Sequence, residues 1–187
     1  RRVAYMPQDR PVPSISVRRM ALHGRFPYLD WPRRYSKADY AAAERALERA
    51  DALDIAPRML TELSGGQRQR AYLAMALAQE TGSVLMDEPT AFLDIGHQLA
   101  VMDTARQLAS EGRAVVLVSH DLCQSLRVAG RVALLAEGRL QQLSAPEALY
   151  ESGALDRAFG VRVRRVETEG GWQYYCEEPP EGGVHNG

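Results

Sequence analysis

Residues 63–88 read LSGGQRQRAYLAMALAQETGSVLMDE, and this stretch decides the fold. It begins with a glycine-containing turn over residues 63–67, which leads into an apolar, alanine-rich helix expected over residues 68–78. It ends with a short apolar strand over residues 83–86 that closes on Asp87 and Glu88. A strand that ends in two acids predicts an α/β unit that binds its ligand at the carboxyl end of the strand.

Further strands and helices flank this stretch. We expect a strand over residues 2–6, a helix over residues 95–110, and a strand buried on both faces over residues 114–118, where the apolar run is uninterrupted. Residues 132–136 and 139–143 flank Glu137-Gly138, which is a hairpin signal. The alternation of strands and helices predicts an α/β fold with a mostly parallel sheet.

Two other segments have recognisable boundaries. Ser36 is a candidate N-cap of a helix, with Asp39 three residues later as a weaker form of the capping box. Near the other end, residues 161–167 and 172–176 flank a Glu-Gly-Gly turn and predict a second hairpin. Residues 177–187 are expected to be disordered.

Composition limits the classes of protein that the chain can belong to. The 187 residues carry a formal net charge of −1, so bulk charge gives no reason to expect nucleic-acid binding. No apolar run approaches the roughly 18 residues that a membrane span needs. Cys123 and Cys176 form no CxxC motif and are far apart, so neither a disulfide framework nor a zinc site is expected, and a reducing compartment is indicated.

Four sets of residues could carry chemistry, and each also has a structural explanation. Of Asp87 and Glu88, one acid could hold Mg²⁺ through water and the next could accept a proton, or both could simply face solvent. The glycines of residues 64–67 could let backbone N–H groups approach a phosphate, or the segment could be a plain helix cap. His120 could donate to a phosphate or be structural, and Gln8 alone carries almost no information.

The order and spacing of these features resemble the ATP-binding subunit of ABC transporters. LSGGQRQR matches the signature motif of that family, and VLMDEPT matches its Walker B strand. Residues 91–94 look like its D-loop, His120 like its switch histidine and Gln8 like its Q-loop. The resemblance covers residues 1 to about 160. Residues 24–28, 74–81, 93–98, 119–122 and 138–140 further resemble importers of ferric siderophores, haem or cobalamin.

The resemblance implies a P-loop NTPase core with an inserted helical subdomain and without the N-terminal β-subdomain. The implied parts are a core strand with the Q-loop (1–8), the helical subdomain (9–80), the α/β ATPase core (81–160), and a hairpin with a disordered tail (161–187). A P-loop, GxxxxGK[ST], is absent, because the single lysine, Lys37, has no glycine at the required spacing. We therefore expect a C-terminal portion of such an ATPase, unable to bind MgATP tightly or to turn it over alone.

The resemblance also implies roles for individual residues toward ATP and Mg²⁺. Asp87 and Gln8 would face the metal, Glu88 would act on the attacking water, and His120 would contact the γ-phosphate. Asp94 would link the two sites of a dimer. The signature residues would complete the nucleotide site of the partner subunit; they are Ser64, Gly65, Gly66 and Gln67.

The partners implied by the resemblance are a second ATPase subunit, in a head-to-tail homodimer, and membrane permease subunits that dock on residues 9–35. A periplasmic binding protein would be an indirect partner, nucleic acid would not be one, and the protein would lie peripherally on the cytoplasmic face of the inner membrane.

Alternatives are a non-catalytic remnant that binds a partner, or an ATPase for another imported substrate. An ABC-type ATPase of DNA repair is disfavoured, because no sustained heptads separate Gln8 from Ser64.

Overall fold

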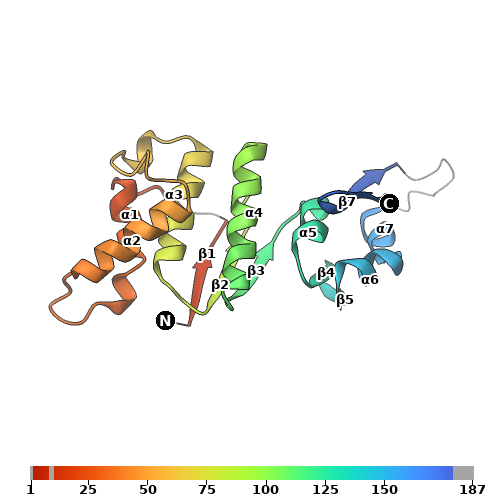
Figure 1. Ribbon diagram of the computed structural model, residues 1–187, viewed down its shortest axis with the longest axis horizontal. Coiled ribbons are helices and arrows are strands. Elements are labelled where there is room, and N and C mark those ends of the chain that lie inside the picture. The colour runs from red at the N-terminus through yellow and green to blue at the C-terminus, as the bar shows by residue number, and fades with distance from the viewer. Residues whose placement is uncertain (1, 9–10, 179–187) are drawn as a thin grey trace. The chain divides into compact units, whose positions relative to one another are not determined.

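The computed structural model describes residues 2–8 and 11–178. The chain forms two compact units, Arg1–His120 and Asp121–Gly187, each considered by itself (Figure 1). The four-part division expected from the sequence stays a prediction. The elements of the first unit are β1 (Val3–Met6), α1 (Val17–His23), η1 (Phe26–Tyr28), α2 (Lys37–Arg49), η2 (Leu60–Glu62), α3 (Gly65–Ala78), β2 (Ser83–Asp87), α4 (Ile95–Ser110) and β3 (Ala114–Val118).

A parallel sheet with the strand order β1-β2-β3 forms the base of the first unit. Met6 pairs with Met86, which pairs with Leu117, and the two methionines are fully buried. Residues that pair across neighbouring strands point to the same face of a sheet, so these three side chains share a face. That face packs against the helices of the core. The expected α/β fold with a parallel sheet is confirmed.

The opposite face of this sheet is not buried within the first unit. Tyr5 on β1 and both Val116 and Val118 on β3 are about half exposed, at 48%, 54% and 49%. The expectation that β3 is buried on both faces is wrong. Only its alternate residues, Val115 and Leu117, pack against the core, because β3 is an edge strand of the described sheet with one covered face.

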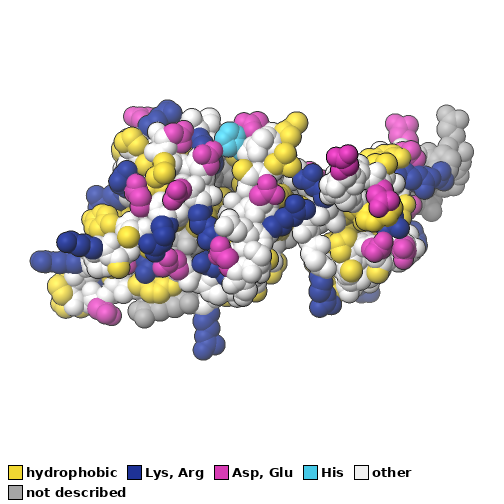
Figure 2. Space-filling view, viewed as in Figure 1, with side chains coloured by type: hydrophobic (Ala, Val, Ile, Leu, Met, Phe, Trp, Pro, Cys, Tyr) yellow, Lys and Arg dark blue, Asp and Glu magenta, His cyan; other side chains and the backbone are white. Residues whose placement is uncertain are grey.

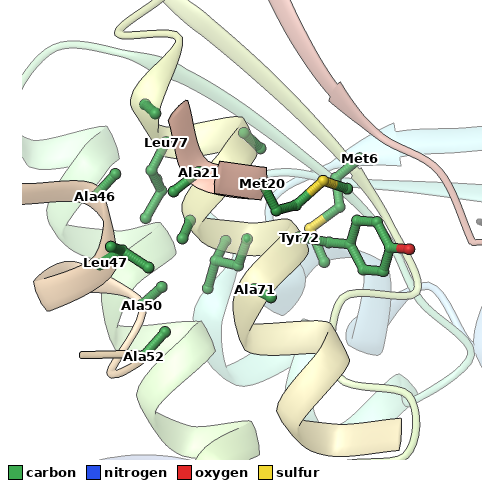
Figure 3. Close-up of a cluster of buried hydrophobic side chains, with 14 of the residues drawn as sticks. Met6, Met20, Ala21, Ala46, Leu47, Ala50, Ala52, Ala71, Tyr72 and Leu77 are labelled. Carbon is green, nitrogen blue, oxygen red and sulfur yellow. The ribbon is translucent and has the colours of Figure 1, made fainter. Parts of the chain in front are cut away.

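Three helices, α1, α2 and α3, pack on one another and make up most of the core. Figure 3 shows side chains from all three gathered in one cluster, among them Ala21, Ala46 and Leu77. Small side chains allow these helices to approach closely. At Gly24, directly after α1, an added Cβ would overlap the carbonyl oxygen of Met75 in α3, so only glycine fits there.

Helix starts follow the sequence signals in one case and depart from them in another. Ser36 caps α2, and Asp39 completes a capping box, as predicted. The alanine-rich helix α3 begins at Gly65 rather than at residue 68. Ser64 caps it, so the two glycines expected in a turn are its first helical residues. The cap satisfies N–H groups of the first turn and offsets the low helix propensity of glycine.

Acidic and basic side chains are interspersed on the face of the first unit shown in Figure 2. Several of them pair between elements that are distant in sequence. The pairs are Arg18–Glu44, Arg45–Glu80 and Arg49–Glu111, with N···O distances of 3.3, 2.8 and 2.9 Å. Because these side chains are exposed or half-exposed, each pair adds little stability by itself.

The second unit consists of α5 (Leu122–Val128), β4 (Val132–Ala136), β5 (Arg139–Ser144), α6 (Pro146–Glu151), α7 (Ala154–Phe159), β6 (Arg162–Thr168) and β7 (Gly171–Glu177). Both predicted hairpins are confirmed as antiparallel pairs, β4-β5 and β6-β7. Glu137 and Gly138 form the first turn with φ of 52° and 70°, as a tight hairpin turn requires. Glu177, expected in the disordered tail, is in β7, and residues 179–187 lie outside the described residues.

The two cysteines meet in this unit. Cys123 in α5 and Cys176 in β7 are 53 residues apart in sequence, yet their Sγ atoms lie 3.9 Å from each other. The separation in sequence does not show this closeness, which arises because α5 packs on the β6-β7 hairpin. Both cysteines are free thiols in the structure.

Across residues 2–8 and 11–178, no helix combines the length and the apolar character needed to cross a bilayer.

Candidate functional site

The candidate residues follow the carboxyl ends of three neighbouring parallel strands. Gln8 comes two residues after Met6, the last residue of β1, and Glu88 directly follows β2. Because Met6 pairs with Met86, Gln8 and Glu88 leave the sheet at the same level. His120 follows β3, whose last residue Val118 pairs with Asp87. The register thus brings Gln8, Asp87, Glu88 and His120 to one edge of the sheet, where open α/β sheets bind ligands.

Glu88 and His120 are in direct contact. Nδ1 of His120 lies 2.7 Å from Oε2 of Glu88. The Glu88 side chain is 12% exposed, whereas that of His120 is 81% exposed, so the imidazole covers a carboxylate that is otherwise enclosed. Glu88 has φ of 49°, in the left-handed region, and its N–H donates to the carbonyl oxygen of Val118 at 3.0 Å. Such backbone strain is tolerated where the surroundings fix the conformation, often at functional sites.

Gln69, in the second turn of α3, holds the backbone at Glu88. It is buried, and its Nε2 donates to the carbonyl oxygens of Glu88 at 3.0 Å and of Pro89 at 2.7 Å. The amide therefore connects the helix that begins at Ser64 to the carboxyl end of β2. Gln69 was not predicted as a site residue. The signal in the sequence is a polar residue five positions after Ser64 on a helix that is otherwise expected to be apolar.

The four residues of the signature motif form the N-terminus of α3. The Oγ of Ser64 accepts a hydrogen bond from the N–H of Gln67 at 3.3 Å, and the Gln67 Oε1 accepts one from the N–H of Ser64 at 3.2 Å. The structural alternative, a plain helix cap, is therefore present in this chain. It does not exclude a phosphate, because the positive end of the helix dipole and the N–H groups of Gly65 and Gly66 lie at the same terminus.

Both signature glycines lie against the segment over residues 91–94. An added Cβ on Gly65 would lie 3.2 Å from the Cβ of Phe92, and one on Gly66 would lie 3.1 Å from the Phe92 carbonyl oxygen. Phe92 has φ of 64°, and the residue is 85% exposed. The structure thus brings the signature motif and the candidate D-loop together within one chain, and close packing gives the glycines a second reason to be there.

Asp94 is the N-cap of α4. Its Oδ1 accepts a hydrogen bond from the N–H of His97 at 3.0 Å, and both carboxylate oxygens lie 2.8 Å from the His97 Nδ1. The backbone N–H of His97, and then its side chain, lower the pKa of Asp94. Nε2 of His97 also lies 3.8 Å from the Asp51 carboxylate, so His97 spans two acids. His97 lies in the segment over residues 93–98 that resembles the importers, but it was not predicted as a site residue.

Asp87 and Gln8 are the residues at this edge that could supply oxygen ligands for magnesium. Asp87 offers a carboxylate and Gln8 an amide oxygen, and Mg²⁺ prefers such ligands while keeping several waters. Within the part of the chain that the structure describes, no group of three or more His, Cys, Asp or Glu side chains could hold a metal. A magnesium ion here would therefore take most of its remaining ligands from water and from a bound phosphate.

The chain is similar in sequence to known proteins. A family model described as ABC transporter matches residues 1–91. The chain is 36% identical over 169 residues to the ferric enterobactin transport ATP-binding protein FepC of Escherichia coli (strain K12), covering 89% of this chain and 62% of that protein. It is 40% identical over 167 residues to the hemin import ATP-binding protein HmuV of Rhodococcus jostii (strain RHA1), covering 89% and 56%. The chain thus spans less than two thirds of these relatives.

Solved structures share the fold. A structure described as a metal-chelate type ABC transporter in an inward-facing conformation superposes with a TM-score of 0.82 at 26% identity, covering 94% of this chain and 72% of that one. A dimeric bacterial ABC transporter cassette, MJ0796, superposes with a TM-score of 0.69 at 25% identity, covering 78% and 63%.

Proposed function

We propose that the chain is part of an ATP-hydrolysing subunit of the ABC transporter family, which powers import of a metal chelate across the bacterial inner membrane. The chelate would be a ferric siderophore, haem or cobalamin. The observation that carries the proposal is the contact of Glu88 with His120 at the carboxyl edge of the parallel sheet. The names of the relatives, which concern ferric enterobactin and hemin, support the class of cargo.

In the proposed reaction, Glu88 accepts a proton from the water that attacks the γ-phosphate of ATP. Its carboxylate is suited to this role because it is nearly enclosed and its backbone is fixed by Val118 and Gln69. His120 is exposed enough to turn toward the γ-phosphate and donate a hydrogen bond as charge develops there. Phosphoryl transfer needs positioning and charge stabilisation above all, and both residues supply these.

Asp87 and Gln8 are the residues of this chain that would hold Mg²⁺ beside the nucleotide, directly or through water. When bound, the metal ion neutralises negative charge on the phosphate oxygens. Gln8, which is exposed and follows β1, would also sense whether that site is filled.

The signature motif would act on the nucleotide of a second subunit in a head-to-tail dimer. Gly65 and Gly66 would offer backbone N–H groups, and the N-terminus of α3 would favour the negative charge of the phosphates. Asp94 would link the two nucleotide sites of the dimer, since the loop over residues 91–94 packs on Gly65 and Gly66. The dimeric form of a similar cassette supports this assembly.

The permease would dock on the arginine- and aromatic-rich segment before α2. In the described part of that segment, Trp31 is 91% exposed and Phe26 is 41% exposed, and the guanidinium of Arg33 lies 4.8 Å from the Phe26 ring. Exposed aromatic and arginine side chains are enriched at interfaces. The subunit would then lie peripherally on the cytoplasmic face, and a periplasmic binding protein would deliver cargo to the permease.

The proposal is tested in the full-length protein by Glu88→Gln. The variant should bind MgATP with unchanged affinity while turnover falls by at least about 100-fold, because the amide cannot accept the proton. Binding is measured by calorimetry and turnover by phosphate release. The matched control is Glu111→Gln, which alters an exposed carboxylate near the amino end of β3, at the opposite end of the strand from the site. Normal hydrolysis by Glu88→Gln would refute the role of Glu88.

The cargo is tested by reconstituting the protein with its permease and binding protein in vesicles. ATP-dependent accumulation is compared for a ferric siderophore, haem and cobalamin, with a sugar and an amino acid as controls. Accumulation of one chelate supports the proposal. Transport of a control solute alone would leave the ATPase assignment intact and overturn the metal-chelate assignment.

A further inference from the structure

Cys123 and Cys176 form a close pair of thiols in the second unit. Their Sγ atoms are 3.9 Å apart, whereas a disulfide needs about 2 Å. Rotation of the two side chains must therefore shorten the distance by about 2 Å, a change within reach of a rotamer adjustment. The pair lies outside the candidate nucleotide site and has no part in the proposed hydrolysis.

The elements that carry these cysteines are both anchored to one core. Cys123 is the second residue of α5, whose Leu126 is 3% exposed. Cys176 lies on β7 opposite Val163, which is also buried. Cys176 shares a face of β7 with Tyr174, and Tyr174 packs against the same core. The closeness of the thiols is therefore a product of packing and not of a loose loop.

From this geometry we infer that Cys123 and Cys176 form a reversible intramolecular disulfide by exchange with a low-molecular-weight disulfide such as oxidised glutathione. Cys176 is exposed and meets the oxidant first, while Cys123 is half-buried behind it. The Cys176 thiolate attacks one sulfur of the oxidant, forming a mixed disulfide and releasing one glutathione thiolate. The Cys123 thiolate then attacks the Cys176 sulfur and releases the second. Two protein thiols are oxidised and one oxidant disulfide becomes two thiols.

The order of the two steps follows from the surroundings. Burial, followed by the charge of Cys176 and the hydrogen bond with it, raises the pKa of Cys123 to about 11. Cys123 therefore stays protonated while Cys176 is a free thiol. After Cys176 has become a mixed disulfide it carries no negative charge, so the contribution of Cys176 to the raised pKa is removed while that of burial remains. The thiolate fraction of Cys123, held next to the Cys176 sulfur, then acts as the resolving group.

The test is peptide mapping of the intact protein after incubation with oxidised glutathione. Trypsin cleaves after Arg113, Arg127 and Arg165, so Cys123 lies in the peptide 114–127 and Cys176 in the peptide that begins at Val166. We expect the two peptides joined by a disulfide, with a mass lower than their sum by two hydrogen atoms, and both thiols recovered on reduction. In concentrated urea the linked fraction should fall by about tenfold, because the fold supplies the effective concentration.

Two variants make the outcome decisive. Cys123→Ser should stop at a glutathione adduct on Cys176, because the resolving thiol is missing. Cys176→Ser should react more slowly than the wild type, since the remaining thiol is half-buried. A wild-type protein that accumulates only the glutathione adduct, or that links separate chains through Cys176, would overturn the inference.

Discussion

Nδ1 of His120 lies 2.7 Å from Oε2 of Glu88, so an exposed imidazole closes over a nearly enclosed carboxylate. The two residues follow different strands, and the parallel register of β2 and β3 brings them together. An exposed side chain can leave this contact when a phosphate offers a better one, whereas Glu88 is held by its backbone. In the proposed reaction, the pair would combine a fixed base with a movable hydrogen-bond donor.

His120→Ala should reduce ATP turnover of the full-length protein by about 100-fold with little change in MgATP affinity, because a donor to the γ-phosphate is lost. His120→Gln, which keeps a donor, should lose less. Phosphate release and calorimetry measure the two quantities. Weaker MgATP binding with unchanged turnover in His120→Ala would instead show that His120 contacts bound ATP without stabilising the transition state.

Ser64→Ala should destabilise the protein by about 1 kcal/mol, because the N–H of Gln67 loses its capping oxygen. Ser64→Asn should restore the stability, since asparagine is an equally good cap. Urea denaturation measures both. If Ser64 also contacts nucleotide in a dimer, Ser64→Asn in the full-length protein should remain slow in hydrolysis despite normal stability. Equal activity of Ser64→Asn and wild type would show that Ser64 acts only as the N-cap of α3.

Gly24→Ala should destabilise the first unit by about 2 kcal/mol, since the new Cβ would overlap the Met75 carbonyl oxygen and force α1 away from α3. Gly82→Ala is the matched control, because nothing lies within 4 Å of a Cβ added there. Denaturant midpoints of the two variants should differ clearly. A Gly24→Ala protein as stable as the control would show that the two helices separate at no cost.

Asp39→Asn should cost about 2 kcal/mol at neutral pH, because Asp39 accepts hydrogen bonds from Ser36 and from Arg25, whose Nε lies 3.0 Å from Oδ1. Burial alone would raise the pKa of Asp39, but these partners outweigh it and lower the pKa. The stabilisation is therefore complete above the unfolded pKa, near pH 4, and is lost as the pH falls through the folded value. Denaturant midpoints of both proteins should converge in acid; a constant difference would contradict this.

Local signals predicted local structure well. The capping box of Ser36 and Asp39 and the turn at Glu137-Gly138 each depend on a few neighbouring residues, and both are confirmed. The predicted start of α3 at residue 68 was wrong, since the helix begins at Gly65. Glycine is a poor helix former, and the prediction did not allow for the stabilisation that the Ser64 cap provides. The extent of burial of β3 could not be predicted, because an uninterrupted apolar run does not tell whether both faces of a strand are covered by other elements.

Long-range contacts were beyond the sequence. The motif order predicted which residues gather at the sheet edge, but not that Gln69 would fix the Glu88 backbone or that Phe92 would lie on Gly65 and Gly66. The contact of Cys123 with Cys176 depends on how a helix packs on a hairpin 53 residues away in sequence. Such contacts follow from tertiary packing, which local sequence patterns do not reveal.

The pairing of Val3 with Ser83 has a consequence for how this chain folds. The whole helical region lies between β1 and β2, so their ladder closes a long loop, and the entropy of that closure opposes early pairing. The contacts among α1, α2 and α3 span shorter separations and can form first. During synthesis β1 must wait for β2 to emerge, so contacts among the helices can form before the edge that carries Gln8 and Glu88 is complete.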